Sequence, residues 1–316
     1  MLDFHVEREL KVLQLSDPQI MSNYIEEPDM VYEKAFWYIE ETVKATKPDL
    51  ILLTGDLVYG QYDHDGVSFK ALVDFMENLK ILWAPVFGNH DNESRIGVAW
   101  QCEQLTNATY CLFNRRHNIG GNGNTSIALA KDGELQRTIY MLDSNGCWET
   151  DDPAVKTNTG FTEEQKEWYY TMAQRTNAIE ERVIPSFVAY HIPTNEVLSA
   201  AISACYQQGE DSSNISYVIG EDVEAQEGDS GSKGEIFKGI YEATNFLRYL
   251  NEVGGDGTFF GHSHCNNTSV MFGKIRWTFG LKTGTYERYP SKVGGTLVIL
   301  SANDSTFQVK QVVVEQ

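Results

Sequence analysis

Four short apolar stretches of this 316-residue chain run directly into polar side chains of the kinds that bind metals. The stretches at 10–16, 49–55, 81–88 and 257–261 are predicted strands, each with a Gly- or Ser-bearing turn. Open α/β sheets place their ligands in the crevice outside the carboxyl ends of their strands. The side chains delivered there are Asp17, Asp56, Asn89 with His90, and His262 with His264, and a further strand ends at His191. This series predicts a two-metal site.

The remaining sequence alternates strands and helices without internal repeats, which predicts an α/β fold. Helices are expected at 29–47, 67–80 and 238–253. A further helix is expected to begin at Thr162, where the spacing of a capping box occurs. Further strands are expected at 137–142, 186–190, 274–279, 295–300 and 307–314. The short links between the last strands indicate a second, partly antiparallel sheet. We expect one domain over residues 1–316, with an acidic loop insertion at about 207–233.

Composition limits the partners of the chain. Hydrophobic residues make up 41% and charged residues 22%, and no apolar run is long enough to cross a membrane. The formal charge of −20 argues against nucleic acid or an anionic membrane as a partner, because both would be repelled. A pair of metal cations would reconcile this charge with an anionic substrate. Oligomeric state is not encoded in any pattern of the sequence.

Localisation is left open by the sequence. Five cysteines are too few for a disulfide framework, and no signal peptide precedes the first strand. The protein is expected to be cytoplasmic if Met1 is native, and secreted or lysosomal if a leader has been removed. Asn-x-Ser/Thr triplets occur at Asn92, Asn107, Asn124, Asn214, Asn266, Asn267 and Asn303. Three of them, at 92, 266 and 267, adjoin the metal motifs, where a glycan would block the site.

The chemistry that these side chains suit is hydrolysis of a phosphate ester. Two metals about 3.5–4 Å apart neutralise phosphoryl oxygens and generate hydroxide near neutral pH. A carboxylate bridges such a pair well, and Asp56 is the expected bridge. Mn, Zn and Fe accept carboxylate and imidazole together. Because Gly261 permits a turn before His262-Ser263-His264, the two imidazoles can diverge to different metals.

Taken in order, these motifs resemble the calcineurin-like metallophosphoesterase superfamily. Gly88-Asn89-His90-Asp91 and Gly261-His262-Ser263-His264 carry most of the resemblance, which spans residues from about 10 to 265. The segments 160–169, 190–193 and 280–284 resemble its purple-acid-phosphatase-related, Dcr2-like branch. The resemblance implies a four-layer α/β/β/α sandwich of two mixed sheets flanked by helices. The dimetal centre would lie at the carboxyl ends of the strands.

The resemblance also implies a role for each motif residue. One metal would be held by Asp17, Asp56 and His264, and the other by Asp56, Asn89, His191 and His262. His90 would face the substrate, stabilise the phosphoryl charge and assist the leaving group. Asp91 would hold the His90 imidazole in one tautomer.

One position departs from the superfamily pattern. Most members have Asp-x-His at the first motif, whereas Asp17-Pro18 is followed here by Gln19. A Gln oxygen binds a metal, but it is neutral and a weaker ligand than imidazole. Purple acid phosphatases lack that His too and use a Tyr three residues after the bridging Asp, where this chain has Tyr59. Either Gln19 or Tyr59, or neither, completes the first site.

We therefore expect a dimetal hydrolase of phosphate esters, with a phosphomonoesterase favoured. Its substrate would be a small molecule or a phosphoprotein. The alternatives are a phosphodiesterase on nucleotides or lipid head groups, and a non-catalytic binding protein on the same scaffold. Candidate substrate contacts are Arg95, Lys282, Tyr286 and Arg288. Asp143 is interpreted as an Asx-turn residue rather than as a ligand.

Overall fold

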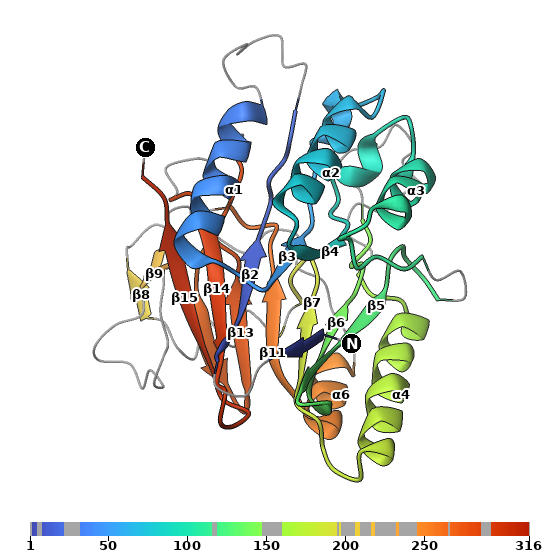
Figure 1. The fold of residues 1–316 in the computed structure, drawn as a ribbon, viewed down its shortest axis with the longest axis vertical. Coiled ribbons are helices and arrows are strands. Elements are labelled where there is room, and N and C mark those ends of the chain that lie inside the picture. The colour runs from blue at the N-terminus through green and yellow to red at the C-terminus, as the bar shows by residue number, and fades with distance from the viewer. Residues whose placement is uncertain are drawn as a thin grey trace.

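Two β-sheets packed face to face, with helices on both outer faces, form the protein (Figure 1). The computed structural model describes residues 2–4, 8–21, 32–115, 119–146, 160–194, 196, 206–208, 216–218, 232–233, 245–264, 266–285 and 292–315. The expected α/β/β/α sandwich of two mixed sheets is confirmed.

The smaller sheet has five strands in the order β15-β14-β2-β3-β4. β2 (Leu10–Leu15), β3 (Leu50–Thr54) and β4 (Leu82–Val86) are parallel. β14 (Gly294–Leu300) runs antiparallel to β2, and β15 (Phe307–Val313) runs antiparallel to β14. The second, partly antiparallel sheet that we expected exists, but the last strands of the chain are divided between both sheets.

The larger sheet has seven strands in the order β1-β5-β6-β7-β11-β13-β12. Its bounds are β1 (Leu2–Phe4), β5 (Thr125–Lys131), β6 (Glu134–Met141), β7 (Ser186–Ala189), β11 (Gly255–Phe260), β12 (Ser269–Phe272) and β13 (Ile275–Phe279). Its central strands, β6, β7, β11 and β13, are parallel. Their carboxyl ends therefore share one edge, as those of β2, β3 and β4 do.

The helices α1 (Tyr32–Thr46), α2 (Val67–Leu79) and α3 (Val98–Asn107) lie on the side of the five-stranded sheet (Figure 1). α4 (Glu163–Ile179) and α6 (Phe246–Val253) lie on the side of the seven-stranded sheet. The capping box that predicted the start of α4 is present, with Thr162 and Gln165 bonded reciprocally. Of the helix expected at 238–253, residues 238–244 lie outside the described residues.

Three apolar clusters account for this layering. Leu10, Val12 and Leu52 of the smaller sheet pack against Ile139 and Phe187 of the larger one. The opposite face of each sheet packs against its own helices, so the central strands are apolar on both faces. Burial on both faces fixes the sheets in place, and it leaves the carboxyl ends of the strands as the place where polar side chains gather.

The acidic stretch at about 207–233 includes three short strands. They are β8 (Tyr206–Gln208), β9 (Ser216–Val218) and β10 (Ser232–Lys233), paired antiparallel in the order β10-β9-β8. The rest of the predicted insertion lies outside the described residues. Among the described residues, no helix is both long and apolar enough to span a membrane.

Three of the Asn-x-Ser/Thr triplets are built into the fold. Asn124 and Asn266 are buried, and their amide nitrogens donate to Gly120 O at 2.8 Å and to Ser263 Oγ at 2.6 Å. The Asn92 amide donates to Gly88 O at 3.3 Å. These amides are engaged inside the folded protein, so they are unsuited to carry glycans.

Candidate metal centre

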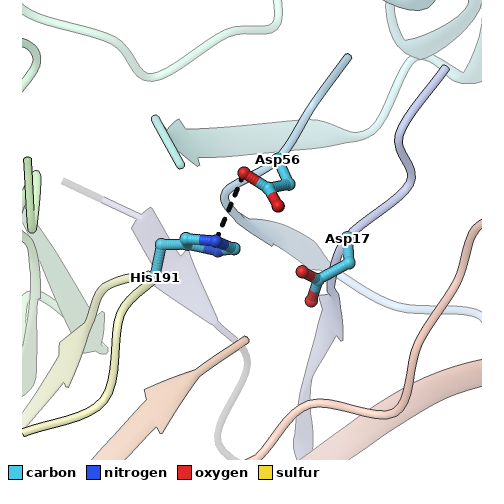
Figure 2. Close-up of side chains that lie close together, drawn as sticks. All are labelled: Asp17, Asp56 and His191. Atoms are coloured by element: carbon cyan, nitrogen blue, oxygen red, sulfur yellow. Dashed lines mark ion pairs between the residues drawn. The ribbon is translucent and has the colours of Figure 1, made fainter. Parts of the chain in front are cut away.

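Three ligand residues from both sheets meet at the carboxyl ends of the strands. Asp17 follows β2, Asp56 follows β3 and His191 follows β7 (Figure 2). Each offers one ligand atom, and these atoms lie within 4.8 Å of one another. All three side chains are buried, and His191 Nε2 lies 3.2 Å from Asp56 Oδ1. The centre therefore lies across the edge where the two sheets meet.

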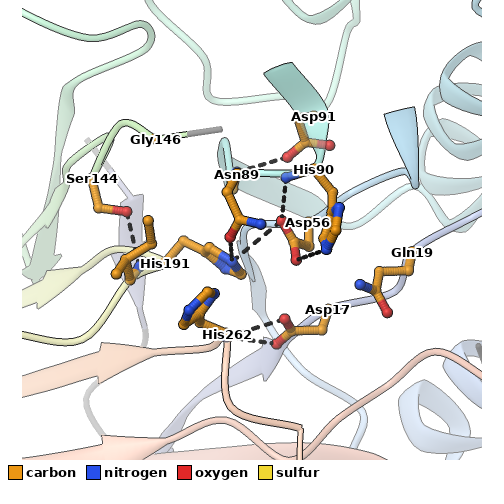
Figure 3. Close-up of polar contacts among 12 residues, drawn as sticks. Asp17, Gln19, Asp56, Asn89, His90, Asp91, Ser144, Gly146, His191 and His262 are labelled. Atoms are coloured by element: carbon orange, nitrogen blue, oxygen red, sulfur yellow. Dashed lines mark hydrogen bonds and ion pairs between the residues drawn. The ribbon is translucent and has the colours of Figure 1, made fainter. Parts of the chain in front are cut away.

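Further expected ligands lie next to these three, and Figure 3 shows Asn89 and His262 among them. His264 Nε2 lies 3.4 Å from Asp17 Oδ1, which is the side expected for the first metal. On the other side, Asn89 Oδ1 lies 3.2 Å from His191 Nε2. The rings of His191 and His262 are 5.2 Å apart at 81°. These distances are compatible with the two ligand sets that the resemblance implied, and the assignment of each side chain to one metal stays a prediction.

Backbone strain aims several of these side chains. Asp17, Asp56 and His262 have φ values of 51°, 49° and 72°, in the left-handed region that non-glycine residues rarely adopt. Such a residue costs on the order of 1–3 kcal/mol, so surrounding contacts must hold it. The Asp17 N–H donates to Gly55 O at 3.2 Å, and the His262 N–H donates to both Asp17 oxygens at 3.1 Å. These hydrogen bonds hold the strained backbone in the conformation that directs the side chains inward.

The glycines of the motifs make room for the ligands. A Cβ atom on Gly88 would lie 2.2 Å from Asp56 Oδ1, and one on Gly55 would lie 2.5 Å from the His191 ring. A Cβ atom on Gly261 would lie 2.6 Å from Asp17 Oδ2. Real Cβ atoms do not approach so closely. Because each of these positions is a glycine, the backbone after one strand can pack directly against a candidate ligand side chain that follows a different strand.

The electrostatics of the centre suit metal binding. Burial opposes ionisation of Asp17, but His264 and His191 outweigh it and hold the pKa of the carboxyl at about 2. His191 is likewise buried, yet the Asp56 and Asp17 carboxylates raise its pKa to about 9. Burial and the neighbouring His191 lower the pKa of His262 to about 3. The metal-free centre thus holds ionised carboxylates, a neutral His262 and a protonated His191.

His191 is oriented as a metal ligand requires. Its Nδ1 atom donates to the carbonyl oxygen of Thr54 at 2.8 Å, which fixes the ring and leaves Nε2 toward the carboxylates. Two ionised carboxylates, an amide oxygen and three imidazoles form a donor set that Mn, Zn and Fe accept. The residues present therefore fit a two-metal centre.

His90 lies beside Asp56, the carboxylate expected to bridge the two metals. Its Nε2 atom is 4.0 Å from Asp56 Oδ2, and the Tyr59 ring stacks on the imidazole at 4.2 Å. Nδ1 of His90 lies 2.9 Å from Oε2 of Glu93. Glu93 is the last residue of the 3₁₀ helix at Asp91–Glu93, and its side chain is only 5% exposed. Because a carboxylate only accepts, Nδ1 carries the proton.

The expected pairing of Asp91 with His90 is wrong, because Glu93 takes that place. Asp91 instead accepts from the backbone N–H groups of Val58 at 3.0 Å and Gly88 at 2.7 Å. Burial and the nearby Asp56 charge raise the pKa of its carboxyl to about 7. Asp91 thus links the loop after β3, which contains Val58, to the loop after β4, which contains Gly88. Sequence reasoning missed Glu93, although its spacing three residues after His90 is the available signal.

The first motif meets a lysine from the far end of the chain. Lys282 and Gln19 are buried, and Lys282 Nζ donates to Gln19 Oε1 at 2.6 Å and to Asp17 O at 3.1 Å. This contact argues against the expectation that the Gln19 oxygen binds the first metal.

Of the other candidate substrate contacts, Arg95 is exposed, whereas Tyr286 and Arg288 lie outside the described residues. The interpretation of Asp143 as an Asx-turn residue is confirmed by its hydrogen bond from Asn145 N at 2.8 Å.

The motifs and the sandwich define a class of protein. The family model for calcineurin-like phosphoesterases matches residues 10–266, and the chain belongs to this family. Among solved structures, a dimetal phosphatase from Danio rerio aligns over 96% of this chain and 99% of its own with a TM-score of 0.53. The identity is 9%, so this likeness shows the fold alone.

Curated relatives are more similar in sequence. Phosphatase DCR2 of Saccharomyces cerevisiae is 25% identical over 243 residues, covering 73% of this chain and 38% of that protein. "Probable inactive purple acid phosphatase 29" of Arabidopsis thaliana is 27% identical over 230 residues, covering 63% of this chain and 58% of that protein. The chain thus spans 38% and 58% of the lengths of these two relatives.

Proposed function

We propose that the protein is a metal-dependent hydrolase of phosphate esters and prefers monoesters. The observation that carries this proposal is the position of His90. Its Nε2 atom points to the bridging carboxylate Asp56, while its Nδ1 atom is held by the buried Glu93. A protein that only bound metal would gain nothing from an imidazole oriented in this way.

The ligand side chains and His90 divide the work. Two bound metals would supply Lewis-acid activation of the phosphoryl group and of the attacking water. Asp17, Asp56 and His264 would hold one, and Asp56, Asn89, His191 and His262 the other. His90 would donate a proton from Nε2 to the leaving oxygen, and Glu93 would stabilise the imidazolium before that transfer. The burial of these groups excludes water, which strengthens each interaction.

Purified protein loaded with Mn²⁺, Zn²⁺ or Fe²⁺ tests the proposal against a generic aryl phosphate monoester and the matching diester. We expect metal-dependent hydrolysis that favours the monoester. Asp56→Asn is the control, since loss of the bridge should deplete both metals and abolish turnover. Hydrolysis that favours the diester would contradict the monoester preference, and full metal content in Asp56→Asn would contradict the bridge.

A non-catalytic binding protein is the second candidate. One relative carries the name "probable inactive", and the first motif lacks the imidazole that the family pattern expects. Protein that binds two metals but hydrolyses neither ester at any pH would favour this candidate. We give it second place because the oriented His90–Glu93 pair has no use in it.

A further inference from the structure

The two polar ends of the Gln19 amide have unequal surroundings. Oε1 accepts a hydrogen bond from Lys282 Nζ at 2.6 Å. Nε2 is buried and has no hydrogen-bond partner among the described residues. A buried donor left unpaired is costly, so a partner from outside the protein would be favourable there.

The lysine decides which end of the amide is which. The oxygen and nitrogen of a glutamine amide have nearly the same shape, and they must be assigned from the surrounding hydrogen bonds. An ammonium group has donors only, so the amide atom that faces Lys282 is the oxygen. The nitrogen then lies on the other branch, and Figure 3 shows it on the side of Gln19 that faces Asp17 and Asp56.

This arrangement is incompatible with Gln19 as a metal ligand. An amide nitrogen offers an N–H group and no free lone pair to a cation. The oxygen is already bonded to the Lys282 ammonium, and a metal on the same oxygen would sit beside that positive charge. The first metal would therefore be held by Asp17, Asp56 and His264 without a contribution from Gln19.

Several contacts hold Gln19 in this position. Its φ of 44° is strained, and its N–H donates to the carbonyl oxygen of Asp56 at 2.9 Å. The segment that carries Lys282 runs beside the first motif, where Gly284 N–H donates to Asp17 O at 3.2 Å. A Cβ atom on Gly284 would lie 2.1 Å from Pro18 O, so only glycine permits this approach. The fold thus fixes the direction of the amide.

We propose that Gln19 Nε2 donates a hydrogen bond to a phosphoryl oxygen of the bound ester, and that Lys282 positions it. A phosphoryl oxygen supplies both the acceptor that the buried N–H group lacks and the negative charge that a nearby ammonium favours. The inference rests on the proposed function for the identity of the ester. Its core, recognition of a tetrahedral oxyanion, is tested with inorganic phosphate alone.

The test compares wild-type protein with Gln19→Met and Gln19→Glu after loading with Mn²⁺. Metal content is measured by elemental analysis, phosphate affinity by calorimetry and folding by the melting temperature. Gln19→Met should keep all the metal of the wild type and bind phosphate about 10- to 100-fold more weakly, the range for a hydrogen bond to a charged group. Gln19→Glu should also keep its metal and should bind phosphate more weakly still, because a carboxylate would face the anion.

Gln19→Glu guards against a variant that fails to fold, because the glutamate side chain has the same shape as glutamine and can pair with Lys282. Gln308→Met removes an exposed amide on β15 and should bind phosphate like the wild type. Loss of one metal equivalent in Gln19→Met would show that Gln19 is a ligand and overturn the proposal. Unchanged phosphate affinity in both Gln19 variants would overturn it as well. Neither readout needs turnover, so a failure of hydrolysis remains distinct from a failure of this inference.

Discussion

His90 Nδ1 lies 2.9 Å from Glu93 Oε2, so the imidazole beside Asp56 is held by a residue of the short helix that His90 precedes. The N–H donor and its acceptor are both buried, with side-chain exposures of 8% and 5%. A buried carboxylate on Nδ1 fixes the tautomer and favours the imidazolium, which is the state that a proton donor needs.

Glu93→Gln should lower kcat by roughly 10- to 100-fold, because the neutral amide stabilises the imidazolium less. The KM for the monoester and the metal content should change little, since Glu93 contacts neither ligand set among the described contacts. Glu103→Gln, an exposed carboxylate on α3, serves as the matched control. A fall in metal content with no change in kcat per metal would contradict this assignment.

His90→Ala should retain the metals of the wild type and lose about 10²- to 10⁴-fold in turnover, the range for a positioned acid–base group. Elemental analysis and monoester hydrolysis, measured on the same preparation, check both parts. If His90→Ala lost one metal equivalent, His90 would be a ligand.

Metal uptake at pH 7 should release a proton from His191. Its pKa of about 9 in the metal-free centre means that a proton must leave before the ring can bind a metal. Apparent affinity should therefore fall about tenfold per unit as pH drops below 9, and it should level off above 9. Calorimetry in buffers of different ionisation enthalpy counts the protons. Affinity independent of pH between 7 and 9 would refute the assigned charge state.

The stability of metal-free protein should fall as pH rises from 6.5 to 9. The pKa of His191 is raised from 6.5 to about 9 on folding, so its contribution is fully present below 6.5 and is lost above 9. The pKa of Asp17 is lowered to about 2, so its contribution is lost only as pH falls from about 4 toward 2. Melting temperatures across pH check both directions. His191→Gln should remove the alkaline decline.

Iron-loaded protein should be colourless. The Tyr59 ring stacks on His90 at 4.2 Å with 22° between the planes, which fits a residue that supports the imidazole. We therefore expect no phenolate charge-transfer band and no visible change in Tyr59→Phe. A purple protein that is bleached by Tyr59→Phe would instead establish Tyr59 as the ligand that completes the first site.

The strands that carry the site could be predicted from sequence, because β2, β3, β4 and β7 are apolar on both faces and end in polar turns. The short edge strands β1 and β12 of the larger sheet could not. β1 and β12 have three and four residues, and their pairing with β5 and β13 stabilises them more than any local preference does. For the same reason, the sequence did not predict that β12 and β13 join the larger sheet while β14 and β15 join the smaller one.

Within the site, motif spacing led to the ligand candidates but not to the residues that hold them. Glu93 belongs to a single 3₁₀ turn, which has no periodic pattern. Lys282 meets Gln19 across 263 residues of sequence, through a bridge between Ser16 and Lys282 that only the folded sheet creates. Contacts of this kind depend on tertiary structure and leave no trace in a local pattern.

β2, the strand that leads into Asp17, pairs with β3 on one side and with β14 on the other. β14 follows all the expected ligand residues in the sequence, so it is synthesised after them. A nascent chain that has left the ribosome as far as His264 has all the ligand side chains, yet β2 still presents an unpaired edge. During synthesis, β2 can complete its pairing only after Gly294–Leu300 has been made. We therefore expect stable metal loading only after Gly294–Leu300 has been made, rather than as soon as His264 has been made.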